Sequence, residues 1–150
     1  MRVVIQRVTQ ASVSIGNIQH SDIGQGLLIL LGIEESDTAE DIAWLCGKIS
    51  RIRLFDDDQG IMNLSVQEIN GEVMVISQFT LHASTKKGNR PSYIKAAKPE
   101  TAIPLYNKFL KEMEGLLGKE VKSGTFGAMM QVSLVNDGPV TIVIDSKNKE

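Results

Sequence analysis

The sequence predicts an α+β fold in which mainly antiparallel or mixed β-sheets form a barrel- or sandwich-like body covered by two main helices. Three observations lead to this prediction. Short stretches of alternating apolar and polar residues recur, turn residues separate them, and only two segments show helical spacing of their apolar residues. The length of 150 residues suits a single domain, and no repeat or linker divides residues 1–150.

The first third of the chain predicts strands. Apolar residues alternate with serines between residues 11 and 15, which is the period of a half-buried strand, and Gly16-Asn17 supplies a tight turn. We therefore expect strands joined by hairpins over residues 3–20. The apolar run LLILLGI at residues 27–33 is typical of a strand that is buried on both faces.

A capping signal predicts the first helix. Thr38 and Asp41 have the spacing of a capping box, in which each side chain bonds the backbone N–H of the other. Five apolar residues then recur at helical spacing and form one buried stripe: Ile42, Leu45, Cys46, Ile49 and Ile52. Because Cys46 lies on this stripe, we expect a buried, unreactive thiol. Residues 56–60 lack the spacing and the closing Glu of a calcium loop, and they predict a surface turn.

The second helix follows a loop rich in Lys, Gly and Pro. Pro99 and Pro104 mark its start, because proline is tolerated in a first helical turn. Its apolar stripe comprises seven residues: Leu105, Tyr106, Phe109, Leu110, Met113, Leu116 and Leu117. Gly118 suits the C-terminal cap.

The remaining segments predict strands and turns. Asn70-Gly71 is a strong hairpin signal, with VMVISQFTL at residues 73–81 as the outgoing strand. Residues 130–134 and 140–144 alternate and predict two final strands, with the turn sequence Asn-Asp-Gly-Pro between them. We expect the polar tail from Ser146 to be loose.

The composition narrows the function classes. A net charge of −2 excludes a general nucleic-acid coat protein held by overall charge. One cysteine excludes an internal disulfide, and the two histidines have no metal-ligand spacing, so we expect no metal and no other cofactor. No signal-peptide pattern is evident, and the longest apolar run, residues 27–31, is too short to cross a bilayer. These features predict a soluble, cytoplasmic protein without a membrane partner.

One stretch departs from the even charge balance. Between His82 and Glu100 lie five cations and no acidic residue: Lys86, Lys87, Arg90, Lys95 and Lys98. Such a stretch can contact phosphates. Charge alone favours a solvated loop over a phosphate-binding segment.

Two motifs carry most of the functional information. The SQFTL motif, residues 77–81, places polar residues at the end of an apolar strand, and the NDGPVT motif, residues 136–141, forms a turn between two strands. Taken singly, each has a structural explanation, since strands often end in polar residues and Asn-Asp-Gly-Pro is favourable turn chemistry. Together, in this order and near these positions, they resemble the two signature motifs of the D-aminoacyl-tRNA deacylase family.

The resemblance extends along nearly the whole chain. Residues 1–15 (MRVVIQRVTQASVSI), 86–93 (KKGNRPSY) and 124–141 (GTFGAMMQVSLVNDGPVT) match the family's pattern. One departure is Ser84, just before Thr85, where many members carry an acidic residue. This departure touches neither motif and bears on how the loop after the SQFTL motif is held.

The resemblance implies an enzyme that hydrolyses the ester joining a D-amino acid, or mischarged glycine, to tRNA, which is a quality-control step of translation. It implies a homodimer that binds tRNA and has no DNA partner. The pocket of each subunit is then completed by Gly138 and Pro139 of the other, joined by a cis peptide bond. Carbonyl oxygens of this step would bind the α-ammonium group while the backbone blocks an L side chain, so chirality is enforced by a clash.

The resemblance also assigns the residues that bind the aminoacyl group. Ser77, Met129 and Arg7 join Gly138 and Pro139 in this role. For Arg7, a solvent-facing position on a strand is an equally good interpretation, because its charged head can reach water from there.

Catalysis is assigned to Gln78, Phe79 and Thr80 of the SQFTL motif. Thr80 could act as a nucleophile, but no His or Lys of the motif could activate it. The alternative that we favour uses the backbone N–H groups of Phe79 and Thr80, with Gln78, to stabilise the developing oxyanion, while the 2′-hydroxyl of the tRNA positions or activates water. The neighbouring motif also makes three cations candidate contacts for tRNA phosphates: Lys86, Lys87 and Arg90.

Two other functions stay open on the sequence alone. A small esterase or amidase of the same fold could act on free D-amino-acid derivatives, although such a metabolite would not need the cationic stretch. A non-catalytic chirality-binding or RNA-binding module is compatible with a chain that has neither a catalytic triad nor a metal motif. Comparing the turnover of charged tRNA with that of a simple D-amino-acid ester separates the esterase from the deacylase, and incubation with D-aminoacyl-tRNA identifies a non-catalytic module.

Overall fold

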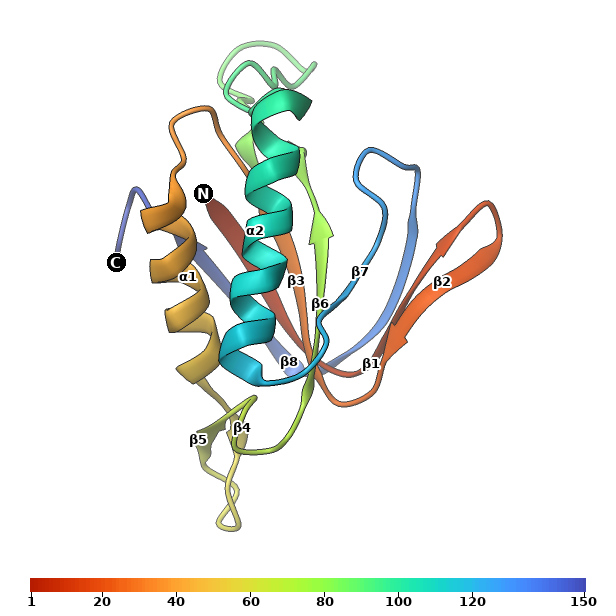
Figure 1. Ribbon diagram of the computed structural model, residues 1–150, viewed down its shortest axis with the longest axis vertical. Helices are drawn as coiled ribbons and strands as arrows, with labels where there is room; N and C mark the ends of the chain where they lie inside the picture. The colour runs from red at the N-terminus through yellow and green to blue at the C-terminus, as the bar shows by residue number, and fades with distance from the viewer.

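The alternating segments form strands and the two apolar stripes form helices in a computed structural model of residues 1–150 (Figure 1). The elements in chain order are β1 (Arg2–Ile15), β2 (Ile18–Ile23), β3 (Gly26–Gly32), α1 (Ala39–Arg51), β4 (Arg53–Asp56), β5 (Met62–Ser65), β6 (Glu72–Ser77), the 3-10 helix η1 (Phe79–His82), α2 (Pro99–Leu117), β7 (Lys122–Ser123) and β8 (Gln131–Asp145). The predicted α+β class, a mixed and barrel-like sheet covered by two helices, is confirmed.

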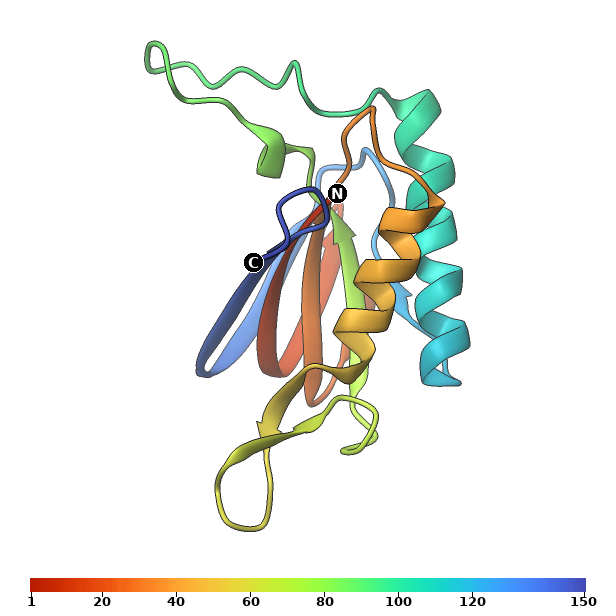
Figure 2. The ribbon, with the colours of Figure 1, turned by 90° about the vertical axis from the view of Figure 1, so that its left-hand side faces the viewer.

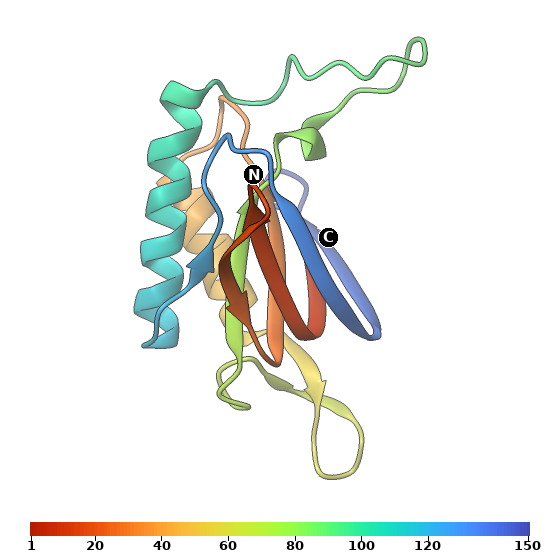
Figure 3. The ribbon, with the colours of Figure 1, turned by 90° about the vertical axis from the view of Figure 1, so that its right-hand side faces the viewer.

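One curled sheet forms the body of the molecule. Its strand order is β2-β1-β3-β6-β7, with β8 along the other side of β1. The strand β1 pairs antiparallel with β2, β3 and β8, whereas β3 and β7 both run parallel to β6. The register between β1 and β8 shifts around residues 6–10, where both strands bend, and this bend curls the sheet toward a barrel (Figures 2 and 3).

Both helices cover the same face of the sheet and lie side by side (Figures 1 and 2). The predicted capping box starts α1, where the Asp41 carboxylate accepts the Thr38 N–H at 2.8 Å. Gly118 ends α2 with a φ of 66°, as expected for a glycine cap. On the inner side of α2, the Tyr106 hydroxyl donates to the Val75 carbonyl at 2.8 Å, and burial raises its pKa to about 12.

The core lies between the helices and the sheet. Phe109 of α2 and Ile29 of β3 are both fully buried in it. Cys46 is fully buried as well, and this burial, together with the nearby charge of Glu112, raises the pKa of its thiol. The predicted buried thiol is therefore confirmed.

The predicted hairpin at Asn70-Gly71 is wrong. A turn does form there, with a φ of 53° at Asn70, but β6 then pairs in parallel with β3. The reason is burial: residues 73–76 are all buried, which they can be only in the interior of the sheet. The hairpin of this region instead joins β4 and β5, and the surface turn predicted at residues 56–60 lies at its tip.

Two finer predictions are also wrong. Ser146 does not belong to a loose tail, because its buried hydroxyl donates to Asp41 at 2.6 Å, and Lys147 Nζ lies 2.8 Å from the same carboxylate. A carboxylate at the start of α1 therefore holds the polar tail. Pro104 lies in the second turn of α2, not the first, so the Glu100 carbonyl lacks its usual backbone donor.

Candidate active site

The SQFTL motif begins on β6 but ends on a short 3-10 helix. The strand stops at Ser77, Gln78 leaves the sheet, and η1 follows; the strand predicted to continue to residue 81 is therefore too long. Gly32 at the end of β3 allows the close approach of η1, since a Cβ there would lie 2.9 Å from Leu81 Cβ and 3.0 Å from the Gln78 carbonyl oxygen. The first N–H groups of a helix have no acceptor within it, so those of η1 are available to a ligand.

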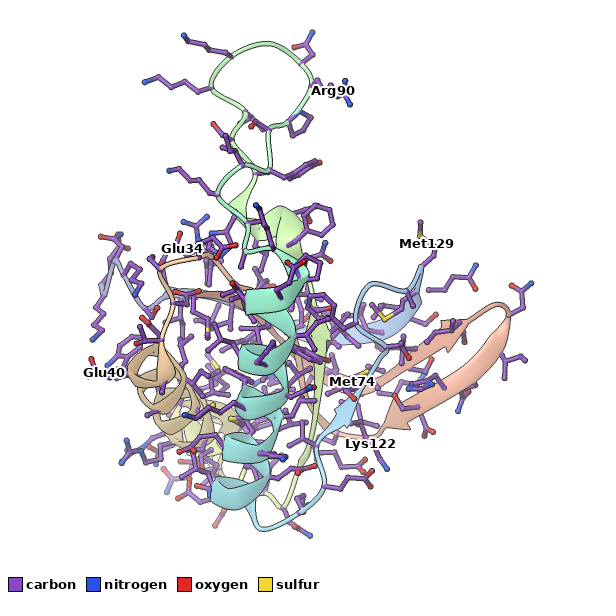
Figure 4. All side chains as sticks on the ribbon, turned by 45° about the horizontal axis from the view of Figure 1, so that its top comes forward. Glu34, Glu40, Met74, Arg90, Lys122 and Met129 are labelled. Carbon is purple, nitrogen blue, oxygen red and sulfur yellow. The ribbon has the colours of Figure 1, made fainter.

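A cavity of about 360 Å³ opens beside this turn. Its walls come from the ends of β3 and β6, the start of α2 and the loop between β7 and β8, and they are mostly apolar. Four predicted site residues meet here, since Ser77, Gln78, Phe79 and Met129 all line the cavity. Met129 is 90% exposed and projects from its own loop (Figure 4). A mostly apolar cavity with a few polar groups on one wall is the usual form of a small-ligand site.

Thr80 lies next to the cavity without lining it. Its hydroxyl oxygen accepts a hydrogen bond from Gln78 Nε2, and this is its only side-chain hydrogen bond. His82, two residues further on, is buried and its Nδ1 lies 3.6 Å from Glu34 Oε2. No hydrogen bond joins the Thr80 hydroxyl to an imidazole or ammonium group that could activate it as a nucleophile.

Residues 83–95 form a long arm that leaves the body at the cavity end of the sheet (Figures 2 and 3). An isolated antiparallel bridge between Ser84 and Ser92, with N···O distances of 2.8 and 2.9 Å, closes its base. This backbone pairing holds the loop without an acidic residue at position 84. The three candidate phosphate contacts, Lys86, Lys87 and Arg90, are all exposed beyond the bridge. Figure 4 labels Arg90 on this arm.

The NDGPVT motif lies at the opposite end of the sheet from the cavity. Its residues pair with residues 6–8 of β1, beside the start of β3, whereas Ser77 pairs with Leu31 near the end of β3. Strand spacing and rise place the two motifs on the order of 20 Å apart. Figure 2 shows η1 above the upper end of the sheet and the bend of β8 at the lower end of the sheet. The cavity of this chain therefore receives nothing from its own Gly138–Pro139 step.

Side chains hold this end of β8 in place. The Asn136 Oδ1 accepts the Val140 N–H at 3.1 Å, and Arg7 Nε donates to the Asp137 carbonyl at 3.1 Å. The Gly138–Pro139 bond is cis, as expected, and both of its residues are exposed. The predicted turn is thus a bend within β8 that is braced from inside and open to solvent.

Arg7 is the brace of this bend. Its side chain is buried, so the solvent-facing interpretation is wrong. Besides Asp137, it binds the Leu54 carbonyl at 2.6 Å and lies 3.4 Å from Asp56 Oδ1. The bend also needs a glycine at position 138, where φ is 125° and a Cβ would lie 2.8 Å from a methyl carbon of Val140.

Sequence reasoning missed three contributors to the cavity end. Gly32 is the one glycine within the apolar run of residues 27–33, and the sequence does not show that η1 approaches it closely. Nothing in the sequence marks His82, whose Nε2 is buried without a hydrogen-bond partner. Ala97 fastens the returning end of the arm, because its N–H donates to the Ile33 carbonyl at 2.9 Å.

No group of three or more His, Cys, Asp and Glu side chains is arranged to hold a metal ion. Neither helix has the length and apolarity needed to cross a membrane.

Comparison with known proteins agrees with the two motifs. The profile of the family described as D-Tyr-tRNA(Tyr) deacylase matches residues 4–145. Proteins named D-aminoacyl-tRNA deacylase from Bacteroides thetaiotaomicron and Flavobacterium johnsoniae are 65% and 61% identical, each over the full length of both chains. The chain therefore belongs to the D-Tyr-tRNA(Tyr) deacylase family.

Solved structures show the same fold. One described as c-Myc DNA Unwinding Element Binding Protein is 41% identical, with a TM-score of 0.91 over 97% of this chain and 98% of that one. Another, described as a probable eukaryotic D-amino acid tRNA deacylase, is 18% identical, with a TM-score of 0.82 over 95% of this chain and 97% of that one.

Proposed function

We propose that this protein hydrolyses the ester bond of D-aminoacyl-tRNA, and of mischarged glycyl-tRNA, in a homodimer. The observation that carries the proposal is the cavity lined by the SQFTL motif, in a chain that matches deacylases over its whole length. Water adds to the ester carbonyl carbon, the bond from that carbon to the ribose oxygen breaks, and the ribose oxygen takes up a proton. The products are free tRNA and a free amino acid.

Backbone donors supply the stabilisation of the oxyanion. The N–H groups of Phe79 and Thr80 begin η1 beside the cavity, where no helical carbonyl can accept them. A preorganised donor of this kind contributes about 10²–10³ in kcat. The 2′-hydroxyl of the substrate positions or activates the attacking water, because the Thr80 hydroxyl is hydrogen-bonded to an amide and not to a base.

The partner subunit supplies the chiral filter. The Gly138–Pro139 step is braced and exposed, yet lies on the order of 20 Å from the cavity of its own chain. A two-fold symmetric dimer would bring each step to the cavity of the other subunit. Its carbonyl oxygens would then bind the α-ammonium group, while its backbone occupies the space of an L side chain. Glycine has no side chain to exclude and passes the filter.

The cationic arm favours a nucleic-acid substrate over a free D-amino-acid derivative. Lys86, Lys87 and Arg90 are exposed on an arm that begins at η1, so they can reach phosphates of the acceptor end of a tRNA bound at the cavity. A small ester or amide offers these cations no partner.

The test compares three substrates at one salt concentration: D-aminoacyl-tRNA, the matched L-aminoacyl-tRNA and a simple ester of the same D-amino acid. The proposal expects rapid release of the amino acid from the D form, little release from the L form, and slow turnover of the simple ester. Faster turnover of the simple ester would favour an esterase of free derivatives. Binding of D-aminoacyl-tRNA without hydrolysis would favour a binding module.

A further inference from the structure

Two aromatic side chains are exposed next to the cavity. The rings of Phe79 and Tyr93 meet edge to face with centroids 5.1 Å apart and an interplanar angle of 73°. Phe79 is 55% exposed and Tyr93 is 40% exposed, whereas every other aromatic residue of the chain is buried or half-buried. An edge-to-face contact leaves ring surface free, so the pair offers flat apolar surface to solvent.

The pair lies on the route from the cavity to the arm. Phe79 lines the cavity, and Tyr93 belongs to the returning segment of the arm, just after the bridge residue Ser92. The arm beyond it carries Lys86, Lys87 and Arg90 and no acidic residue (Figure 4). A ligand that leaves the cavity along this route meets first an aromatic surface and then a cluster of positive charge.

We infer that the Phe79–Tyr93 pair is a stacking platform for an unpaired nucleotide of tRNA, the one that precedes the terminal adenosine. The inference rests on the proposed function, which places the esterified terminal ribose at the cavity. The single strand that runs from the cavity toward the cationic arm then passes Phe79, which lines the cavity, and Tyr93 beside it. Proteins bind unpaired bases by stacking them on aromatic side chains beside cations that contact the backbone. A double-stranded stem offers no free base face, and a free amino-acid ester has no base at all.

Direct binding tests the platform independently of hydrolysis. The probes are uncharged tRNA and the same tRNA trimmed of its unpaired 3′ nucleotides, each titrated with the parent protein and with Tyr93→Leu at fixed salt. We expect the parent to bind intact tRNA more tightly than trimmed tRNA. Loss of base stacking should weaken the binding of intact tRNA by Tyr93→Leu about 5- to 150-fold and leave the trimmed tRNA unaffected.

Two further variants separate stacking from a general disturbance of the arm. Tyr93→Phe keeps the ring and should bind both probes like the parent. Ile94→Ala removes a side chain that is 88% exposed on the same segment and is not aromatic, so it should also match the parent. A Tyr93→Leu protein that binds both tRNAs like the parent, or loses affinity equally for both, would overturn the inference.

Kinetics locate the stacked base. With the D-aminoacyl ester of adenosine alone, which ends at the terminal nucleoside, Tyr93→Leu should keep the kcat and KM of the parent. With D-aminoacyl-tRNA, its KM should rise while kcat stays the same. An equal rise of KM on both substrates would place the effect inside the cavity and contradict the platform. If the parent hydrolyses neither substrate, the proposed function fails, and the binding comparison still decides the platform.

Discussion

The two ends of the sheet are built differently. At the cavity end, Gly32 and the short turn of η1 surround an apolar space with backbone donors and a few polar groups. At the other end, Arg7 and Asn136 fix a bend whose tip, Gly138–Pro139, is exposed and lies away from the cavity of its own chain. The packing of one chain is enough to form the cavity end. The other end is a braced backbone presented to solvent, as the proposed dimer requires.

Phe79→Pro, at the cavity end, should reduce catalysis more than any other variant. Proline removes one oxyanion donor, yet it is tolerated at the first position of a helix, and Gln78 before it is already non-helical. We expect kcat for D-aminoacyl-tRNA to fall about 10²–10³-fold. Phe79→Leu is the matched control, because it loses the same ring but keeps the N–H, and its kcat should stay near that of the parent. Equal losses of kcat in the two variants would show that the N–H is not a donor.

At the other end, Arg7→Ala removes the brace of the bend. Hydrogen bonds to charged groups contribute about 1.5–3 kcal/mol, so we expect kcat/KM for the D substrate to fall about 10- to 100-fold. The ratio of D to L hydrolysis should fall too, because a loosened bend excludes the L side chain less well.

The control for Arg7→Ala is Arg53→Ala, which removes an exposed arginine of the neighbouring strand β4, bound to Asn63 at 3.2 Å. It should keep both rates. An Arg7→Ala protein that is less stable yet keeps the D to L ratio of the parent would separate the bend from the chiral filter.

Thr80→Ala should have a smaller effect. The Thr80 hydroxyl has no base, and its backbone N–H survives the substitution. We expect single-turnover rates to fall less than about tenfold, with no acyl-enzyme trapped by rapid quenching, because one neutral hydrogen bond contributes only about 0.5–1.5 kcal/mol. Complete loss of hydrolysis with normal tRNA binding would contradict this prediction and favour Thr80 as the nucleophile.

The smallest effect is expected from the arm, in a protein that carries Lys86→Gln, Lys87→Gln and Arg90→Gln together. The plot of log affinity against log salt has a negative slope, and each lost phosphate contact reduces the magnitude of that slope by about 0.7–0.9. We therefore expect the slope for tRNA to flatten by about 2–3 and kcat to stay the same. Lys108→Gln on the exposed side of α2 serves as the control. An unchanged slope would show that the arm is a solvated loop that contacts no phosphate of the tRNA.

Local signals predicted local structure well. The capping box at Thr38, the glycine cap at Gly118 and the burial of Cys46 depend on residues close in sequence, and all three are confirmed. The turn at Asn70-Gly71 was also predicted, but the strand with which β6 pairs after this turn was not. Parallel pairing of β6 with β3 is decided by burial against a strand some 45 residues away, which no turn signal encodes.

The same limit applies to the site. The SQFTL and NDGPVT motifs were found because their letters are distinctive, and Ser77, Gln78, Phe79 and Met129 do meet in one cavity. The separation of the two motifs within one chain could not be read from their order. It depends on strand pairing, and so does the burial of Arg7, whose partners lie far from it in sequence.

In the proposed dimer the cavity of one subunit works with the bend of the other, and a mixed dimer can test this pairing. Phe79→Pro disables the cavity, and Gly138→Ala disturbs the bend, since its Cβ would lie 2.8 Å from a methyl carbon of Val140. Co-expression with two different affinity tags gives a dimer that contains one chain of each kind. If each site uses both chains, one of its two sites is intact, and we expect about half of the parent's activity on D-aminoacyl-tRNA. A mixed dimer no more active than the two single variants would contradict this pairing.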